Sequence, residues 1–343
     1  MLVLRPVRSA DLRRLVALAG RVASGMTSLP ADEEVLADRI DHSLRSFAAR
    51  VRKAGGEYYL FVLEDSATGD LVGTSALAAR VGGFEPFYSY EIVHESHVHE
   101  ALGIRKEVPL LRLKKTHSGP TELCSLFLRH DHRHAGVGRL LSLARFLFMR
   151  AFPERFAQTV IAELRGYLNP GGRSPFWDAI GRHFFDFDFY GADLLSGLGD
   201  KAFIENLMPR HPIYLNLLPD AVREVIGRVH PNTEPALALL LGEGFELANE
   251  VDIFDAGPQL RAATAHIRTL RAARNAVLSA LPAALPTAPS SEKPWLLANP
   301  AIDFRAALGP LLEHPDGTVS IPPDTAAALG LQPGDTLTLA PLK

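Results

Sequence analysis

A short glycine-bearing segment, residues 133–138 (RHAGVG), has the pattern R-x-x-G-x-G and is the clearest candidate for chemistry in this chain. It follows an apolar run, residues 123–128, and opens a long apolar segment, residues 137–152. Backbone N–H groups at the start of a helix bind phosphate, and glycines let a ligand approach the backbone closely. The pattern is neither the G-x-G-x-x-G of a dinucleotide fold nor the G-K-[ST] of a P-loop. A pyrophosphate loop and a purely structural turn both remain open.

The elements around this loop predict an α/β layer fold, also describable as α+β. Their expected order is strand, helix, helix, strand, strand, strand, helix, strand, helix. The corresponding segments are residues 2–7, 12–19, 31–53, 58–63, 71–79, 123–128, 137–152, 159–164 and 174–185. Residues 82–118 have only weak periodicity and predict no particular element.

This order of elements, together with the R-x-x-G-x-G loop, resembles the GNAT superfamily of acyl-CoA N-acyltransferases. The resemblance implies a mixed sheet with helices on both faces and a loop that holds the pyrophosphate of coenzyme A. The CoA-binding residues implied in the loop are Arg133, Gly136, Val137, Gly138 and Arg139. The strand before the loop is expected to separate from its neighbour and to offer a backbone N–H to the thioester carbonyl.

Longer segments resemble one family within this superfamily. They are GMTSLPA (25–31), YLFVLEDSATG (59–69), ELCSLFL (122–128), SPFWDAIGRHFF (174–185), KAFIENLMPRHPIY (201–214), IGRVHPNTEPAL (226–237) and VDIFDAGP (251–258). In this order they are similar to the arginine N-succinyltransferases of bacterial arginine catabolism. The resemblance implies transfer of succinyl from succinyl-CoA, used as a co-substrate, to the α-amino group of L-arginine, with no permanently bound cofactor. A GNAT enzyme with another donor, or with another amine such as ornithine, is the alternative.

Two residue roles follow from the family resemblance. The thioester contact falls on Leu126, where a bulge in the strand would free a backbone N–H to face a developing oxyanion. The proton-transfer histidine falls on His230, before Pro231 and Asn232, which suit the first turn of a helix. A helix N-terminus favours the neutral imidazole that a base needs. Taken alone, the Leu126 side chain is ordinary core and His230 a turn histidine without a task.

The implied substrates carry charges that the site must match. Glu163, on the strand after the loop-bearing helix, is a candidate for the guanidinium, with a structurally paired glutamate as the alternative. Arg165 and Arg182 are candidates for the succinyl carboxylate, each with a surface role as the alternative. Thr27 and Ser28 join the first two helices, a region that lines the acceptor pocket in this superfamily.

Two other groups of residues suggest different chemistry. The spacing of His94, His97 and His99 is compatible with a metal site, but the polar surroundings and the missing fourth ligand argue against one. Cys124 lies in an apolar strand, which favours a buried thiol over a nucleophile. We therefore expect neither a metal ion nor a cysteine nucleophile.

Composition restricts the partners of the chain. Its 343 residues are 47% hydrophobic and 22% charged, with a net charge of −3, which predicts a globular fold and argues against nucleic acid. The single cysteine excludes an intrachain disulfide. Without a signal-peptide pattern or a long apolar run, a cytoplasmic protein that does not span a membrane is expected. The family resemblance implies a homo-oligomer or a heterodimer with a sibling subunit. Because the R-x-x-G-x-G loop is intact, this chain is similar to the loop-bearing form, which argues against the alternative of a non-catalytic partner subunit.

The composition and the pattern of expected elements change near residue 257. We predict an acyltransferase region over residues 1–257, followed over residues 258–343 by a helix, a linker and a small C-terminal β module. The helix is expected at residues 261–277, which are rich in Arg and Ala, and the linker at 281–294. Residues 176–185 and 232–245 share a helix-glycine-aromatic form, which leaves open a second GNAT-like half-unit.

Overall fold

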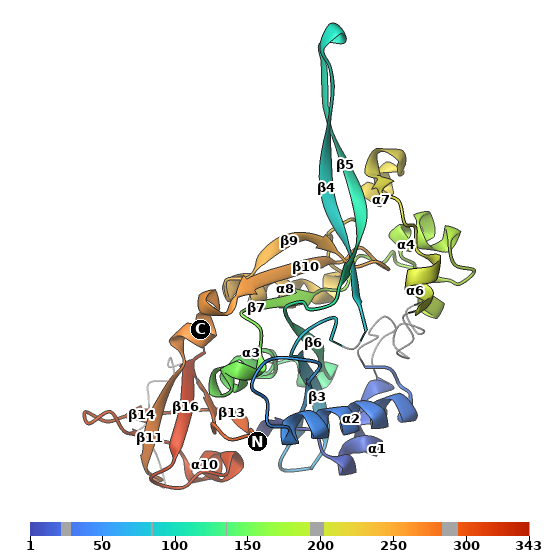
Figure 1. Ribbon diagram of the computed structural model, residues 1–343. Coiled ribbons are helices and arrows are strands. Elements are labelled where there is room, and N and C mark those ends of the chain that lie inside the picture. The colour runs from blue at the N-terminus through green and yellow to red at the C-terminus, as the bar shows by residue number, and fades with distance from the viewer. Residues whose placement is uncertain (22–28, 84, 135, 193–201, 283–293, 343) are drawn as a thin grey trace.

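The computed structural model describes residues 1–21, 29–83, 85–134, 136–192, 202–282 and 294–342 (Figure 1). The first part of the chain contains β1 (Leu2–Pro6), α1 (Leu12–Ala19), α2 (Glu33–Ala48), β2 (Tyr58–Asp65), β3 (Leu71–Ala78), β4 (Phe87–His99), β5 (Ile104–Thr116), β6 (Thr121–Leu128), α3 (Val137–Ala151) and β7 (Thr159–Glu163). The middle part contains α4 (Pro175–Ala179), α6 (Ala202–Leu207), β8 (Ile213–Tyr214), α7 (Asp220–Arg223), α8 (Glu234–Gly242), β9 (Glu246–Val251) and β10 (Pro258–Ala263). The last part contains α9 (Arg268–Ala272), β11 (Arg274–Ala280), β12 (Trp295–Ala298), β13 (Ala306–Gly309), β14 (Leu312–Glu313), β15 (Val319–Ser320), α10 (Pro323–Leu329) and β16 (Thr336–Pro341).

The described strands join in one mixed sheet. Their order is β14-β15-β11-β16-β12-β13-β1-β2-β3-β6-β7-β10-β9-β4-β5-β8. Most neighbours are antiparallel, whereas β6 pairs with β7, and β11 with β15, in parallel. The β6–β7 pair lies near the middle of the sheet, between the N-terminal strands and the strands that follow α8.

Helices cover both faces of the sheet around β2, as the sequence predicts. Side chains alternate along a strand, so neighbouring residues of β2 face opposite sides. Tyr59 and Phe61 pack into the core on the side of α3, whereas Leu60 and Val62 pack into the core beneath α1 and α2. The strongly apolar α3 is buried along most of its length because it lies against this face of the sheet. The predicted strands and helices around the glycine loop are thereby confirmed.

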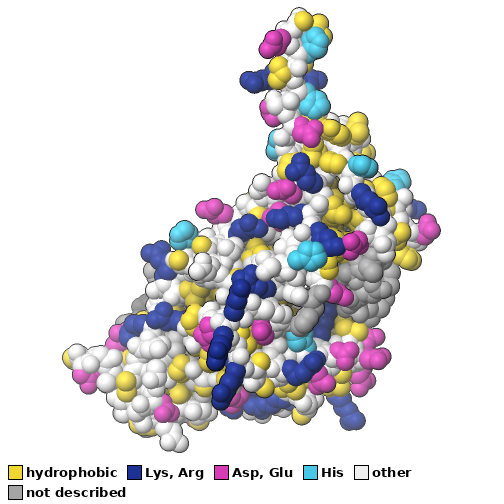
Figure 2. Space-filling model, viewed as in Figure 1, with side chains coloured by type: hydrophobic (Ala, Val, Ile, Leu, Met, Phe, Trp, Pro, Cys, Tyr) yellow, Lys and Arg dark blue, Asp and Glu magenta, His cyan; other side chains and the backbone are white. Residues whose placement is uncertain are grey.

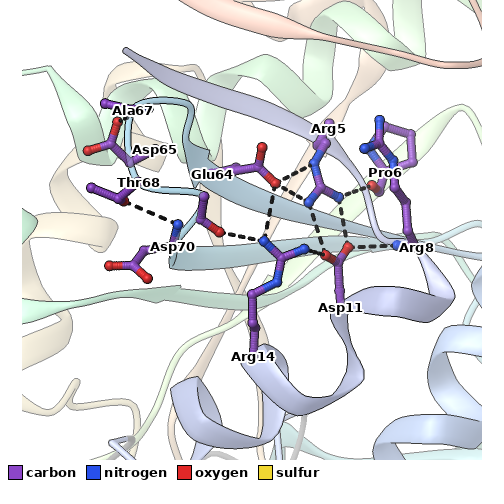
Figure 3. Close-up of polar contacts among 11 residues, drawn as sticks. Arg5, Pro6, Arg8, Asp11, Arg14, Glu64, Asp65, Ala67, Thr68 and Asp70 are labelled. Atoms are coloured by element: carbon purple, nitrogen blue, oxygen red, sulfur yellow. Dashed lines mark hydrogen bonds and ion pairs between the residues drawn. The ribbon is translucent and has the colours of Figure 1, made fainter.

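A buried ion-pair network fixes α1 to the start of the sheet (Figure 3). The guanidinium of Arg5 on β1 donates to both carboxylate oxygens of Asp11, at 2.7 and 3.0 Å, and its Nε donates to Glu64 at 3.0 Å. Arg14 donates to the same Asp11 carboxylate at 2.5 Å. Asp11 is completely buried, so its charge depends on these partners.

A long β-hairpin occupies the segment in which the sequence predicts no element. β4 and β5 pair over their whole lengths, from Phe87 opposite Thr116 to His99 opposite Ile104. The hairpin projects far from the body of the protein (Figure 1), and its outer part carries charged and histidine side chains (Figure 2). We call it the arm. Solvent reaches both faces of its outer part, residues 94–107, which explains why the sequence lacks an apolar alternation there, whereas Tyr90 and Leu111 near its base are buried.

The expected helix at residues 261–277 is wrong. That segment contains the end of β10, the short α9 and the start of β11. Its Arg/Ala composition favours a helix, but pairing of β10 with β7 and of β11 with β16 overrides that preference. The linker predicted at 281–294 lies mostly outside the described residues. The C-terminal β module is present, and β13 joins it to β1 through the pair Leu4 and Ala306. The division of the chain at residue 257 stays a prediction.

The two segments with a shared helix-glycine-aromatic form differ in structure. α8 is followed by Phe245 and then directly by β9, whereas α4 is followed by a 3-10 turn, and the next described strand is β8. A second half-unit of GNAT type therefore stays a prediction. None of the helices in the described ranges combines the length and apolar character that crossing a membrane requires.

Candidate active site

A large cleft lies where β6 and β7 separate. Its volume is about 1310 Å³, and its walls come from β6, the first turns of α3, the end of β7, α8 and the segment after β9. β6 and β7 pair only at their beginnings, with Thr121 opposite Val160 and Glu122 opposite Ile161. Beyond these pairs the two strands diverge, which opens the sheet as the sequence predicts.

The glycine loop forms one end of this cleft. Gly136 precedes α3 with φ +89°, a backbone conformation that favours glycine. Val137 donates its amide to the carbonyl of His134 at 3.3 Å. The amides of Gly138 and Arg139 have no acceptor within the helix, because the first turn of a helix never supplies one. An ideal Cβ on Gly138 would meet no atom within 4 Å, and this residue lines the cleft, so open space lies beside it.

A β-bulge interrupts β6 at the expected position. The register with β3 shifts between the pairs Thr74–Phe127 and Ala76–Cys124, so Ser125 and Leu126 together oppose one residue of β3. Ser125 has φ +51°, which is uncommon for a residue other than glycine. A bulge leaves one residue out of the ladder, and backbone groups of β6 are thereby released next to the cleft.

A buried arginine packs beneath this bulge. Arg145 of α3 is only 2% exposed and donates to the carbonyls of Ala76 and Cys124 at 3.2 and 3.4 Å. Burial lowers the pKa of Arg145 to about 10 and raises that of the Cys124 thiol to about 12. The thiol is therefore protonated at neutral pH, as expected for a structural cysteine. The hydroxyls of Tyr58 and Ser125 share a hydrogen bond of 2.7 Å at the same point of the cleft wall.

Three carboxyl groups line the wall of the cleft that faces the bulge of β6. Glu163 ends β7, and Asp252 and Asp255 lie in the turn between β9 and β10. Oε1 of Glu163 is buried and has no hydrogen-bond partner among the described residues. Burial, and then the nearby Asp252, raise the pKa of Glu163 well above its usual range. Burial likewise raises the pKa values of Asp252 and Asp255, and Asp255 accepts hydrogen bonds from the amides of Gly166 and Gly257 at 2.8 Å.

His230 lies beside the end of this acidic wall. Its backbone N–H donates to the carbonyl of Arg165 at 2.8 Å, next to an isolated antiparallel bridge between Gly166 and Val229. Nδ1 of His230 accepts from the amide N–H of Asn232 at 3.1 Å, so the neutral ring carries its proton on Nε2. Burial and the charge of Arg165 lower the pKa of His230, so its neutral form is favoured.

The structure brings most of the predicted site residues to one cleft. Those that line it are Leu126, Arg133, Gly136, Gly138, Arg139, Glu163 and Arg165. Val137 is buried beneath the loop, and His230 is not among the lining residues, although Asn232 and Thr233 are. Arg182 lines a separate hollow with Arg173 and Asp178. Thr27 and Ser28 lie outside the described residues.

Sequence reasoning missed several residues of the cleft wall. Asp252 and Asp255 belong to the conspicuous segment VDIFDAGP, whose two acids could have been paired with Glu163. Arg145 is a lone charge within the apolar stretch LSLARFLFM, which is a signal for a buried polar contact. Within the described ranges, no group of three His, Cys, Asp or Glu side chains is arranged to hold a metal ion.

Comparison with known proteins gives one consistent result over the whole chain. The family model described as arginine N-succinyltransferase beta subunit matches residues 2–269, and the model of its C-terminal domain matches residues 280–341. The chain is 44% identical to the arginine N-succinyltransferase subunit beta of Pseudomonas aeruginosa, with 99% of this chain and 98% of the relative covered. It is 42% identical to the subunit alpha of the same organism, with 99% of each chain covered. It is also 42% identical to the arginine N-succinyltransferase of Yersinia pestis, with coverage of 100% and 98%.

The similarity extends to three dimensions. The solved structure of arginine/ornithine succinyltransferase subunit AI from Pseudomonas aeruginosa superimposes with a TM-score of 0.90 and 40% identity, with 99% of this chain and 98% of that chain covered. This agreement confirms the predicted mixed α/β fold with helices on both faces. Family models, relatives and fold all agree, and the chain belongs to the arginine N-succinyltransferase family, whose members are acyltransferases that use an acyl-CoA as substrate.

Proposed function

We propose that this chain transfers the succinyl group of succinyl-CoA to the α-amino group of L-arginine. The observation that carries the proposal is the cleft, which has free helix-start amides at one end and three carboxyl groups on one wall. An anionic pyrophosphate matches the first feature, and a cationic acceptor matches the second. The named relatives act on arginine, which agrees with this distribution of charge.

The donor lies between the diverging strands. The loop residues Arg133, Gly136, Gly138 and Arg139, with Val137 beneath them, hold the pyrophosphate, and the thioester lies near the bulge. There the backbone N–H of Leu126 donates to the thioester carbonyl, whose oxygen becomes more negative as the amine attacks. The amine nitrogen forms a bond to the carbonyl carbon, the carbon–sulfur bond breaks, and CoA leaves as the thiol once its sulfur gains a proton.

The acceptor lies against the acidic wall. The guanidinium of arginine remains protonated, so a carboxylate is its natural partner. Glu163 has a buried oxygen without a partner, and Asp252 and Asp255 lie beside it. We assign the guanidinium to Glu163, whose carboxyl group ionises as the cation binds, with the two aspartates beside it. Thr27 and Ser28 remain candidates for a further acceptor contact.

His230 takes the proton from the α-ammonium group in this proposal. A lowered pKa keeps the ring neutral, which suits a base. In the structure, however, the lone pair of Nδ1 faces the amide of Asn232 and Nε2 carries the ring proton. The ring can accept a proton only after it releases the Asn232 amide, either at Nδ1 itself or at Nε2 after a change of tautomer. Substrate binding therefore breaks this exposed hydrogen bond.

The chain functions in an assembly with more than one subunit. Two relatives of similar identity are named subunit alpha and subunit beta, which supports an oligomer. We propose a homo-oligomer or a heterodimer with a sibling chain. Light scattering of the purified chain, alone and after co-expression with a sibling, distinguishes the two.

The test is a matrix of donors and acceptors. Succinyl-CoA, butyryl-CoA and acetyl-CoA are each combined with arginine, ornithine and lysine, and thiol release is measured. We expect release with succinyl-CoA and arginine to be fastest, because charged groups left unpaired in a buried site discriminate strongly. Ornithine is included because the superimposed subunit is named an arginine/ornithine succinyltransferase. Equal rates with acetyl-CoA and succinyl-CoA would contradict the succinyl assignment.

A further inference from the structure

Arg165 is a cation on the cleft wall that the sequence offers as a candidate for the succinyl carboxylate, and the proposed function gives it no role. Its side chain lines the cleft, and its Nε is buried without a hydrogen-bond partner among the described residues. The ion pairs found within the described ranges involve other arginines and lysines, such as Arg261 with Glu250 and Lys114 with the same glutamate. A partly buried guanidinium that lacks an acid is costly unless a ligand supplies one.

The backbone places Arg165 directly beside His230. The bridge between Gly166 and Val229 is antiparallel, so the residues on either side of it also stand opposite each other. Arg165 therefore faces His230, and Tyr167 faces Arg228. The second pair agrees with this geometry, because the guanidinium of Arg228 lies 4.5 Å from the centre of the Tyr167 ring. Side chains of opposite residues lie on one side of the ladder, with their Cβ atoms about 5 Å apart.

Glu163 completes the pattern on the same segment. It precedes Arg165 by two positions at the end of β7, and both side chains line the cleft. A carboxyl group and a guanidinium thus lie along one wall, with His230 opposite the guanidinium-bearing residue. An extended arginine molecule has the complementary arrangement, with a guanidinium at one end and an α-carboxylate at the other. Its nucleophilic amine is attached to the same carbon as that carboxylate.

We infer that Arg165 binds the α-carboxylate of the amino-acid acceptor and thereby holds the α-amine against His230. The inference rests on the proposed function and adds a binding site that recognises the acceptor as an α-amino acid rather than as any amine. Two parallel N–H donors of a guanidinium match a carboxylate, which a lysine cannot reproduce. The carboxylate of the succinyl group is the competing ligand, and the experiment separates the two.

The experiment compares Arg165→Met and Arg165→Lys with the wild type, using arginine and its decarboxylated analogue agmatine as acceptors. Agmatine keeps the amine and the guanidinium but lacks the α-carboxylate. We expect Arg165→Met to lower kcat/KM for arginine about 10- to 100-fold and to leave that for agmatine nearly unchanged. Arg165→Lys should recover part of the arginine activity. If the wild type does not turn over agmatine, calorimetric affinities of the CoA-bound enzyme for the two acceptors give the same comparison.

Arg228→Met is the matched control, because it removes the neighbouring arginine of the same bridge without removing the charge opposite His230. CoA affinity and a melting curve report whether each variant is folded. An equal loss for arginine and agmatine in folded Arg165→Met would overturn the inference. So would a collapse of the preference for succinyl-CoA over butyryl-CoA, because the bound carboxylate would then be that of the donor. A folded wild type without activity on arginine and succinyl-CoA would instead overturn the proposed function.

Discussion

Arg165 and His230 stand opposite each other beside the isolated bridge of Gly166 and Val229, joined by a backbone hydrogen bond of 2.8 Å from the N–H of His230 to the carbonyl of Arg165. The positive charge of one therefore acts on the protonation of the other. After burial, this charge is the second cause that lowers the pKa of His230. Binding of the acceptor at Arg165 is thereby coupled to proton transfer at His230.

His230→Ala should lower kcat about 10²- to 10⁴-fold at pH 7, because the α-ammonium must lose a proton before it attacks. The deficit should shrink as pH rises, since more of the amine is then already neutral. CoA affinity should stay near normal, because His230 lies outside the phosphate loop. His97→Ala, on the exposed arm, is the control. A deficit that does not change with pH would assign the base to another group.

Arg165→Met should raise the pKa of His230 towards its ordinary value of 6.5, because one of the two causes of the depression is removed. The acidic limb of the pH–rate profile should accordingly move to higher pH. Arg165→Lys should move it less, since the positive charge remains. NMR titration of the His230 ring checks this directly, and an unchanged titration midpoint would show that burial alone sets its pKa.

Gly138→Val should weaken CoA binding while the fold is kept. A Cβ at this position meets no protein atom within 4 Å, so the added bulk occupies the cleft rather than the core. Gly136 is a less informative position because its φ of +89° strains any other residue. Gly20→Ala, at the end of α1, is the control for a glycine away from the cleft. Calorimetry with CoA gives the affinities. Equal CoA affinities of the two variants would show that the loop does not bind CoA.

Glu163→Gln should raise KM for arginine about tenfold or more, because a buried charge-assisted bond to the guanidinium is lost. The raised pKa of Glu163 means that its carboxyl group ionises as arginine binds. Arginine affinity should therefore increase with pH in the wild type and depend less on pH in Glu163→Gln. Calorimetry in buffers of different ionisation enthalpy detects the released proton. Equal proton release in both proteins would assign the ionisation to another carboxyl group.

Asp11→Asn should destabilise the protein by about 3–5 kcal/mol, because Arg5 would remain buried with part of its partner set removed. Although burial opposes it, hydrogen bonding to Arg5 lowers the pKa of Asp11 below 3.8. The stabilisation from Asp11 is thus complete above pH 3.8 and is lost as pH falls through the lower, folded value. Denaturant unfolding should show that the difference in the free energy of unfolding between wild type and variant becomes smaller as the pH falls. CoA affinity should not change.

Local sequence patterns predicted the part of the fold around the donor. β2 and β6 are apolar runs bounded by turn residues, and α3 begins directly after a glycine. Each of these patterns spans only a few residues, so it can be recognised in the sequence without knowledge of the tertiary fold. The arm was not predicted, because the strands of its outer part pair with each other in solvent and its base pairs with β8 and β9, which are distant in sequence. β10 and β11 were mistaken for a helix, because their pairing partners are distant in sequence.

The parts of the candidate site that are contiguous in sequence could be predicted, whereas the parts brought together by the tertiary fold could not. The loop at Gly136 and Gly138 is contiguous, and its motif identified it. The acidic wall joins Glu163 to Asp252 and Asp255 through the pairing of β7 with β10, which no local pattern encodes. The bridge that sets Arg165 against His230 likewise depends on the tertiary fold.

The position of β13 beside β1 affects how the chain can fold during synthesis. Leu4 of β1 leaves the ribosome long before its partner Ala306 of β13. Until then one edge of β1 has open hydrogen-bonding groups, which is a site for unwanted pairing between nascent chains. This part of the sheet therefore closes only when β13 arrives, and a chain that stops before β13 exposes an edge of β1 to aggregation.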